Sequence, residues 1–149
     1  MKLLLTALIT FLGSTNAQED AVKEELARMA GDWRLSAGEE DGEAVPDYVL
    51  ENLQCRIADK ELTFKGIEPL VDRAAKLTIT LDPAGKPKCI DLKVVSGSDK
   101  GVTYEGIYEW RGDELRMCLA IRSGVPNRPL EFATKAGSSC VLMTLKRSK

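Results

Sequence analysis

The stretch Gly101 to Ile121, G-V-T-Y-E-G-I-Y-E-W-R-G-D-E-L-R-M-C-L-A-I, decides the fold class. Large apolar residues alternate with polar ones before Gly112, and the alternation resumes after it. A period of two places every second side chain on the same face of a β-strand. Gly112 tolerates the positive φ that a short hairpin turn requires. The stretch therefore predicts two antiparallel strands joined by a tight turn, with Tyr104, Tyr108 and Trp110 on one face.

The rest of the chain extends the same sheet. Alternating apolar residues predict strands over residues 75–81, 88–95 and 140–146. Residues 20–30 are expected to form a short helix with one apolar face, whereas residues 66–73 are expected to be a loop. About eight short strands at regular spacing, with no internal repeat and no linker, predict a single all-β domain. Its form would be an antiparallel barrel or sandwich with a short N-terminal helix.

The N-terminus has the pattern of a signal peptide. Lys2 is a basic start, residues 3–12 form an apolar run, and residues 15–17 (Thr-Asn-Ala) suit cleavage. The run of ten apolar residues is shorter than the roughly 17–25 that a membrane span needs. We therefore expect residues 1–17 to be a removed leader and residues 18–149 to be one exported domain without a transmembrane segment. The destination would be the periplasm or the outside of the cell, and an uncleaved N-terminal anchor is the alternative.

Composition argues against several classes of function. Without Lys2, 20 basic residues face 23 acidic ones, which argues against a nucleic-acid partner. The chain has no histidine, so the commonest general base and metal ligand is missing. Glu105 and Glu109 share a strand face but would lie about 13 Å apart, too far for a glycosidase pair. The sequence indicates no metal site and no cofactor, and it argues against an enzyme without excluding one.

Export would permit disulfide bonds. The four cysteines, Cys55, Cys89, Cys118 and Cys140, allow three complete pairings. Cys118 and Cys140 fall on the two strands expected to be adjacent at the end of the chain, so this pair is the favoured bridge. The alternative is that most of the thiols are free and buried as small hydrophobic groups.

Gly31-Asp32-Trp33 resembles the G-x-W motif that begins the first strand of lipocalins. In that family a late arginine covers the tryptophan, and Arg147 at the end of the last predicted strand could do the same. A guanidinium over an indole ring contributes about 0.5–2 kcal/mol. The resemblance implies that Gly31, Trp33 and Arg147 close a barrel by joining its first and last strands. The second lipocalin motif, T-D-x-Y, is absent.

A broader resemblance covers nearly the whole mature chain. The sequence is similar to an uncharacterised lipocalin-like domain family known chiefly from secreted planctomycete proteins. The matching motifs are G-D-W (31–33), L-T-F-K-G (62–66), L-D-P (81–83), P-K-C-I-D (87–91), G-I-Y-E-W-R-G-D-E-L-R-M-C (106–118), N-R-P-L-E-F (127–132) and L-K-R (145–147). The resemblance implies a lipocalin-like barrel of about eight strands and an export route, but no activity.

The interior of such a barrel can be filled by side chains or can hold one small ligand. We expect a small apolar or amphipathic molecule to contact Tyr104, Tyr108, Trp110 and Met117, with tyrosine hydroxyls as polar contacts. Residues 122–138 would form a rim or lid. The alternative is a filled core in a structural or protein-interaction domain. The sequence indicates neither the ligand's identity nor an oligomeric state.

Arg128 and Glu131 flank Pro129 in the long segment between the last two predicted strands. An arginine–carboxylate pair at this spacing could clamp the segment in place. The alternative is that these polar groups point at a ligand.

Overall fold

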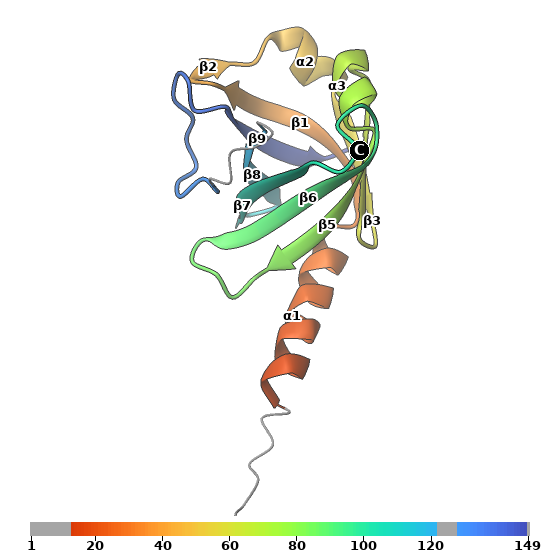
Figure 1. Cartoon of the computed structure of the whole chain (residues 1–149), viewed down its shortest axis with the longest axis vertical. Coiled ribbons are helices and arrows are strands. Elements are labelled where there is room, and N and C mark those ends of the chain that lie inside the picture. The colour runs from red at the N-terminus through yellow and green to blue at the C-terminus, as the bar shows by residue number, and fades with distance from the viewer. Residues whose placement is uncertain (1–12, 122–127, 149) are drawn as a thin grey trace, which may run out of the picture.

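The computed structural model describes residues 13–121 and 128–148, so most of the predicted leader, residues 1–12, lies outside it. The described residues form a closed antiparallel barrel (Figure 1). Its strands are β1 (Gly31–Glu40), β2 (Glu43–Ala44), β3 (Gln54–Ala58), β4 (Glu61–Lys65), β5 (Lys76–Asp82), β6 (Lys88–Ser96), β7 (Thr103–Arg111), β8 (Glu114–Ala120) and β9 (Cys140–Arg147). The helices are α1 (Gly13–Met29), α2 (Asp47–Asn52) and α3 (Glu68–Arg73).

Strands that follow one another in the chain lie side by side in the barrel, apart from the two-residue β2. The sheet order is β2-β1-β3-β4-β5-β6-β7-β8-β9, and pairing of β1 with β9 closes the ring. The short β2 extends only the end of β1, so eight strands form the wall. The predicted all-β barrel of about eight antiparallel strands with an N-terminal helix is confirmed. The expected loop at residues 66–73 is wrong in part, because it contains α3. Pro69 is compatible with that helix, since a first-turn residue needs no backbone donor.

Closure of the barrel brings Trp33 and Arg147 opposite each other. The guanidinium of Arg147 lies 4.4 Å from the centre of the Trp33 ring. Gly31 has a φ of +133°, and a β-carbon there would lie 3.0 Å from an Nη1 atom of Arg147. A glycine is therefore needed where the arginine crosses the chain.

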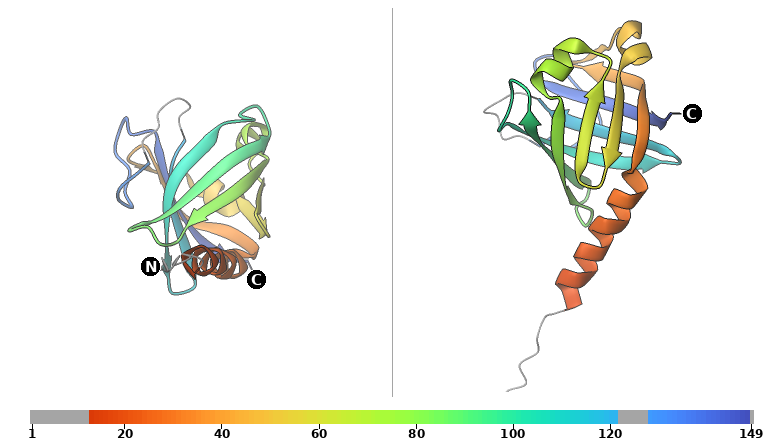
Figure 2. Two further views of the ribbon diagram at one scale, coloured as in Figure 1. Left: turned by 60° about the horizontal axis from the view of Figure 1, so that its bottom comes forward. Right: turned by 90° about the vertical axis from the view of Figure 1, so that its right-hand side faces the viewer.

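Helices cover the two ends of the barrel unequally. Helix α1 leaves one end at an angle, and α2 and α3 lie at the opposite end (Figure 2). The last turns of α1 bury Leu26 and Met29 against the barrel core, whereas its first described turns are largely exposed. Trp33 Nε1 donates a hydrogen bond of 2.8 Å to the carbonyl oxygen of Met29. Helix α1 therefore acts as a plug at one end.

A small apolar layer also lies outside the barrel wall. Ile107, Cys118 and Ala120 alternate with the core-facing residues of β7 and β8, yet they are buried. The segment 128–139 crosses this face. The thiol of Cys118 lies 3.7 Å from the carbonyl oxygen of Ala133, and the Thr134 hydroxyl donates to Glu39 at 2.6 Å.

Candidate functional site

A cavity of about 260 Å³ lies at the barrel end that carries α2 and α3. Its lining includes the buried Phe64, Leu92, Leu119 and Met143 and the partly buried Val141. These residues come from four strands and face inward because the sheet alternates its side chains. The cavity is therefore mostly apolar and belongs to the barrel interior rather than to its outer surface.

Two short helices roof this cavity. Val49 of α2 and Leu70 of α3 line it, and both are only partly buried against the core. Neither helix contains a fully buried residue or has a side-chain hydrogen bond at its N-cap. Because packing and capping supply most of the stability of a short helix, these two helices are weakly held. The open end of the barrel is thus covered by two short helices that bury no residue fully.

A polar cluster occupies one edge of the cavity. Tyr104 and Arg73 line the cavity, and both donate to the same oxygen of Asp99. The Tyr104 hydroxyl lies 2.6 Å from Asp99 Oδ2, while Arg73 Nε and Nη2 lie 3.2 and 3.0 Å from it. Backbone hydrogen bonds from Ser98 and Asp99 to the carbonyl oxygens of Asp72 and Arg73 join the turn after β6 to the end of α3.

The protonation states of this cluster follow from its contacts. Burial, together with the hydrogen bond to Asp99, raises the pKa of Tyr104 to about 12. The hydrogen bond from Tyr104 lowers the pKa of Asp99, and the Arg73 charge lowers it further. At neutral pH the cluster therefore consists of a protonated tyrosine, a carboxylate and a guanidinium, with its two charges balanced.

The other end of the barrel has a different polar cluster, centred on Glu25 of α1. One oxygen of Glu25 accepts from Tyr108 at 2.8 Å and from Trp110 at 3.1 Å, and Lys88 lies 3.5 Å away. Burial raises the pKa of Glu25, but these hydrogen bonds and the Lys88 charge outweigh it, so the net pKa is lowered. Burial and the Glu25 hydrogen bond raise the pKa of Tyr108. The cluster fastens α1 to the barrel.

The structure separates the four residues predicted to contact a ligand. Tyr104 lines the cavity, whereas Tyr108 and Trp110 bind Glu25 at the plugged end. Met117 is fully buried opposite Met143 and does not line the cavity. Four residues along a strand span about 13 Å, so the two tyrosines reach different ends of the interior. Trp110 also stacks under the Arg28 guanidinium, 3.9 Å from the ring centre.

The predicted rim or lid over residues 122–138 is not found where the structure describes that segment. Residues 122–127 lie outside the described part, and residues 128–139 cross the outer face instead of the cavity mouth. The real roof comes from α2 and α3. Sequence reasoning missed Arg73, Asp99 and Val49. The turn Ser96 to Lys100 looked like a plain polar connection, and no local pattern joined it to residue 73.

The predicted Arg128–Glu131 clamp is replaced by a different pair. Arg128 lies 2.8 Å from Asp91 and 4.0 Å from Glu105, and it donates to the carbonyl oxygen of Gly106 at 2.7 Å. Asp91 and Glu105 are register partners on β6 and β7, so they offer two carboxylates to one cation. Glu131 is 68% exposed and contacts Lys135 at 3.8 Å. Arg128 therefore fastens the segment to the barrel wall instead of joining two residues within the segment.

The favoured Cys118–Cys140 disulfide is absent, because all four cysteines are free. The register pairs Cys118 with Leu142 and Cys140 with Ala120, so the two cysteines are diagonal neighbours. Diagonal α-carbons lie about 7–8 Å apart, beyond the roughly 4.4–6.8 Å that disulfides span. Burial, and then the nearby Cys140, raises the pKa of Cys118 to about 11. This thiol is thus a poor nucleophile at neutral pH.

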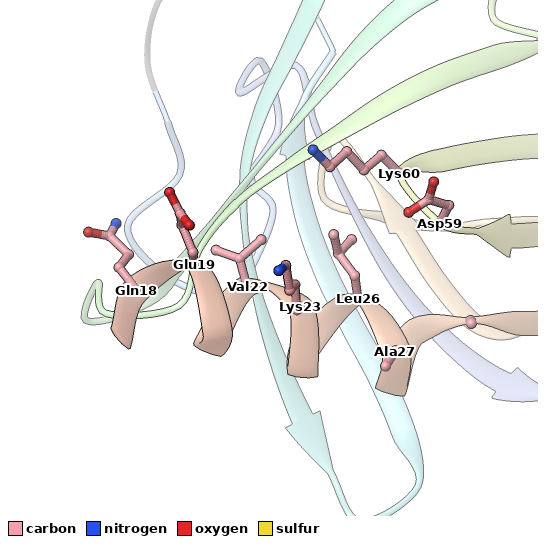
Figure 3. Close-up of a pocket in the computed structure, with 9 residues that line it drawn as sticks. Gln18, Glu19, Val22, Lys23, Leu26, Ala27, Asp59 and Lys60 are labelled. Atoms are coloured by element: carbon pink, nitrogen blue, oxygen red, sulfur yellow. The ribbon is translucent and has the colours of Figure 1, made fainter. Parts of the chain in front are cut away.

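A wider hollow of about 800 Å³ lies beside α1. Val22 and Leu26 project from the helix toward the side where Asp59 and Lys60 of the β3–β4 turn lie (Figure 3). Glu19, Lys23 and Gln18 complete much of its lining. The hollow is formed mainly by one helix and one turn, and four of its nine lining residues carry charge. It resembles a solvated groove more than a ligand pocket, which normally encloses most of its ligand.

No described helix has the length and apolar character needed to cross a membrane. Within residues 13–121 and 128–148, no three His, Cys, Asp or Glu side chains gather where they could hold a metal ion.

Comparisons with protein-family models, with curated proteins and with solved structures found no match to this chain. The class that the structure defines is therefore a small closed β-barrel with an apolar cavity at one end.

Proposed function

We propose that this barrel binds a small apolar or amphipathic molecule in the cavity beneath α2 and α3. The observation that carries the proposal is an apolar cavity of about 260 Å³ with a polar cluster at one edge. Ligand sites are typically apolar concavities with a few placed polar groups. An apolar cavity of about 150 Å³ already binds benzene, so this one has room for a somewhat larger molecule.

The location of the cavity also favours this function over a filled-core domain. The plugged half of the interior is occupied by the fully buried Trp33, Tyr108, Leu115 and Met117. The other half keeps its space although bulky residues surround it. Its roof is two helices with no fully buried residue, and such a roof allows a ligand to enter without opening the barrel wall.

The likeness to the lipocalin-like family of secreted proteins and the leader pattern at residues 1–17 extend the proposal to an exported binding module. The leader pattern is the support for export, and a closed eight-stranded barrel is the kind of fold that the likeness implies. A fold alone does not define a function, so the site carries the argument.

The experiment is an NMR titration of the ¹⁵N-labelled protein with 1-octanol. We expect saturable shifts at the amides of Val49, Leu70 and Tyr104, and little change along α1. Val141→Phe places a ring in the cavity and should abolish these shifts. The matched control is Val95→Phe, because Val95 is exposed on β6 outside the barrel.

The proposal fails if 1-octanol causes no saturable shift in the folded wild-type protein. It also fails if the shifts gather beside Val22 and Leu26, because the groove along α1 would then be the binding surface. Equal binding by Val141→Phe and Val95→Phe would likewise place the ligand elsewhere.

A further inference from the structure

We propose that the cavity selects a neutral molecule with a hydrogen-bond acceptor, such as an alcohol, ketone or ester, over a carboxylate or an ammonium of the same chain length. This inference rests on the proposed function and names the chemical class of its ligand. Its basis is the Arg73–Asp99–Tyr104 cluster at the edge of an otherwise apolar cavity.

The described residues use only part of the hydrogen-bonding capacity of Arg73. An arginine carries five N–H donors. Arg73 directs Nε and one Nη2 donor at Asp99, and its side chain has no other hydrogen-bond partner among the described residues. Its remaining N–H groups can serve a ligand or water. The Asp99 oxygen that faces the cluster already accepts three hydrogen bonds. The cavity edge therefore offers mainly donors, which suit an acceptor on the ligand.

The charges around the cavity disfavour a ligand carboxylate. The guanidinium of Arg73 lies 3.0 Å from the carboxylate of Asp99, so its positive charge is already balanced. Glu40 is the other charged residue that lines the cavity. A ligand carboxylate would lose hydration in a cavity whose lining and edge carry two carboxylates, Glu40 and Asp99, and one guanidinium. Burial of such a charge is unfavourable without an unshared partner.

A ligand ammonium also fits the cluster poorly. An ammonium group has donors only and no acceptor, so it cannot use the free N–H groups of Arg73. It would also stand beside the guanidinium of Arg73, whose charge offsets the attraction of the Asp99 carboxylate. The attraction of Glu40 is reduced because that residue is exposed to solvent. A neutral oxygen meets none of these costs.

The cavity volume sets the size of the ligand, and the exposure of the cluster sets how strongly it discriminates between ligands. Scaling from benzene in a cavity of about 150 Å³, the cavity has room for about ten non-hydrogen atoms. An eight-carbon chain with one polar group matches that number. The side chains of Arg73 and Asp99 are 51% and 26% exposed, so water screens the cluster in part. We therefore expect a discrimination of about tenfold, which corresponds to about 1.4 kcal/mol.

The test compares 1-octanol, octanoate and octylamine at neutral pH, where the last two are charged. Dissociation constants come from the amide shifts of Val49 and Tyr104. We expect 1-octanol to bind about tenfold more tightly than either charged compound. Equal affinities, or a preference for octanoate or octylamine, would overturn the inference and leave the proposed function standing. Absence of binding by all three would reject both.

Two variants distinguish selectivity that comes from the charges of the cluster from selectivity that comes only from the size of the ligand. Asp99→Asn keeps the shape and the acceptor but removes the balancing charge, so octanoate should gain about tenfold relative to 1-octanol. Arg73→Met removes the donors and should weaken 1-octanol binding without helping octanoate. The control is Arg56→Met, because Arg56 is 62% exposed and pairs with Asp32 away from the cavity. An unchanged selectivity in both Asp99→Asn and Arg73→Met would contradict the role of the cluster.

Discussion

The two ends of the barrel are made by the same strands, yet they are covered in different ways. At the plugged end, α1 inserts Glu25 between Tyr108, Trp110 and Lys88, and the space beneath is filled. At the open end, α2 and α3 contribute only partly buried apolar residues, and a cavity remains.

Two tyrosines on β7 illustrate this difference between the ends. Tyr104 and Tyr108 are four residues apart and both face inward, so they are equivalent in the strand pattern. Tyr108 donates to a helix carboxylate and becomes part of a plug. Tyr104 donates to a turn carboxylate at the rim and lines a cavity. The role of each is set by the element that meets its hydroxyl, not by the strand itself.

Substitution of Trp33 tests whether the plugged end supplies most of the stability of the barrel. Trp33→Ala removes a fully buried indole and its hydrogen bond to Met29, so we expect a loss of about 3–5 kcal/mol in the free energy of unfolding. Val49→Ala at the open end removes a partly buried side chain and should cost about 1 kcal/mol. Urea denaturation measures both. Similar losses would remove the energetic distinction between the ends.

The next effect concerns the Glu25 cluster. Glu25→Ala should cost about 2–3 kcal/mol, because it leaves the Tyr108 and Trp110 donors without their charged acceptor. The control Glu24→Ala alters an exposed neighbour and should cost less than about 0.5 kcal/mol. Urea denaturation at neutral pH compares the two. Equal costs would show that Glu25 does not fasten α1.

The same residue predicts a pH dependence. The folded pKa of Glu25 is lowered, so its contribution is fully present above about pH 4.3, the ordinary value of a glutamic acid, and is lost as the pH falls through the folded pKa. Glu25→Gln does not titrate at this position. The stability difference between wild type and Glu25→Gln should therefore be constant near neutral pH and shrink in acid. A difference that grows on acidification would contradict the assigned sign.

Sequence patterns were sufficient to predict the strands that form the wall of the barrel. Alternation over residues 75–81, 88–95 and 140–146 located β5, β6 and β9 to within about two residues, because core burial on one side of a sheet leaves a period of two. The pattern failed at α3. Helices of six residues have too few turns for a periodic signal, and Pro69 with Gly66 favoured a loop.

The site could be predicted only in its strand residues. Tyr104 was found because it belongs to the inward set on β7. Arg73 and Asp99 are 26 positions apart, and they meet because the turn after β6 docks on the end of α3. Gly97 makes that contact possible, since a β-carbon there would lie 2.3 Å from the carbonyl oxygen of Arg73. Such a contact forms only in the closed barrel, so no local sequence pattern predicts it.

A smaller effect tests how the outer segment is held. Arg128→Met should cost about 1–2 kcal/mol, because it leaves Asp91 without its ion-pair partner and the Gly106 carbonyl without its donor. Lys135→Met breaks an exposed pair with Glu131 and should cost about 0–0.5 kcal/mol. Thermal unfolding of the two variants gives the comparison. A larger loss of stability for Lys135→Met than for Arg128→Met would show that the pair with Glu131, and not Arg128, holds the segment.

The smallest effect returns to the two tyrosines. Tyr108→Phe removes one of the donors to the largely buried Glu25, so we expect a loss of about 1 kcal/mol and faster hydrogen exchange in the last turns of α1. Tyr104→Phe leaves Asp99 with Arg73 and partial access to water, so the loss should be about 0.5 kcal/mol, with exchange changed only at the end of α3 and in the turn after β6. Hydrogen exchange followed by mass spectrometry separates the regions. Exchange that changes at the same end in both variants would show that the barrel responds as one unit, and the distinction between a plug and a site would then be wrong.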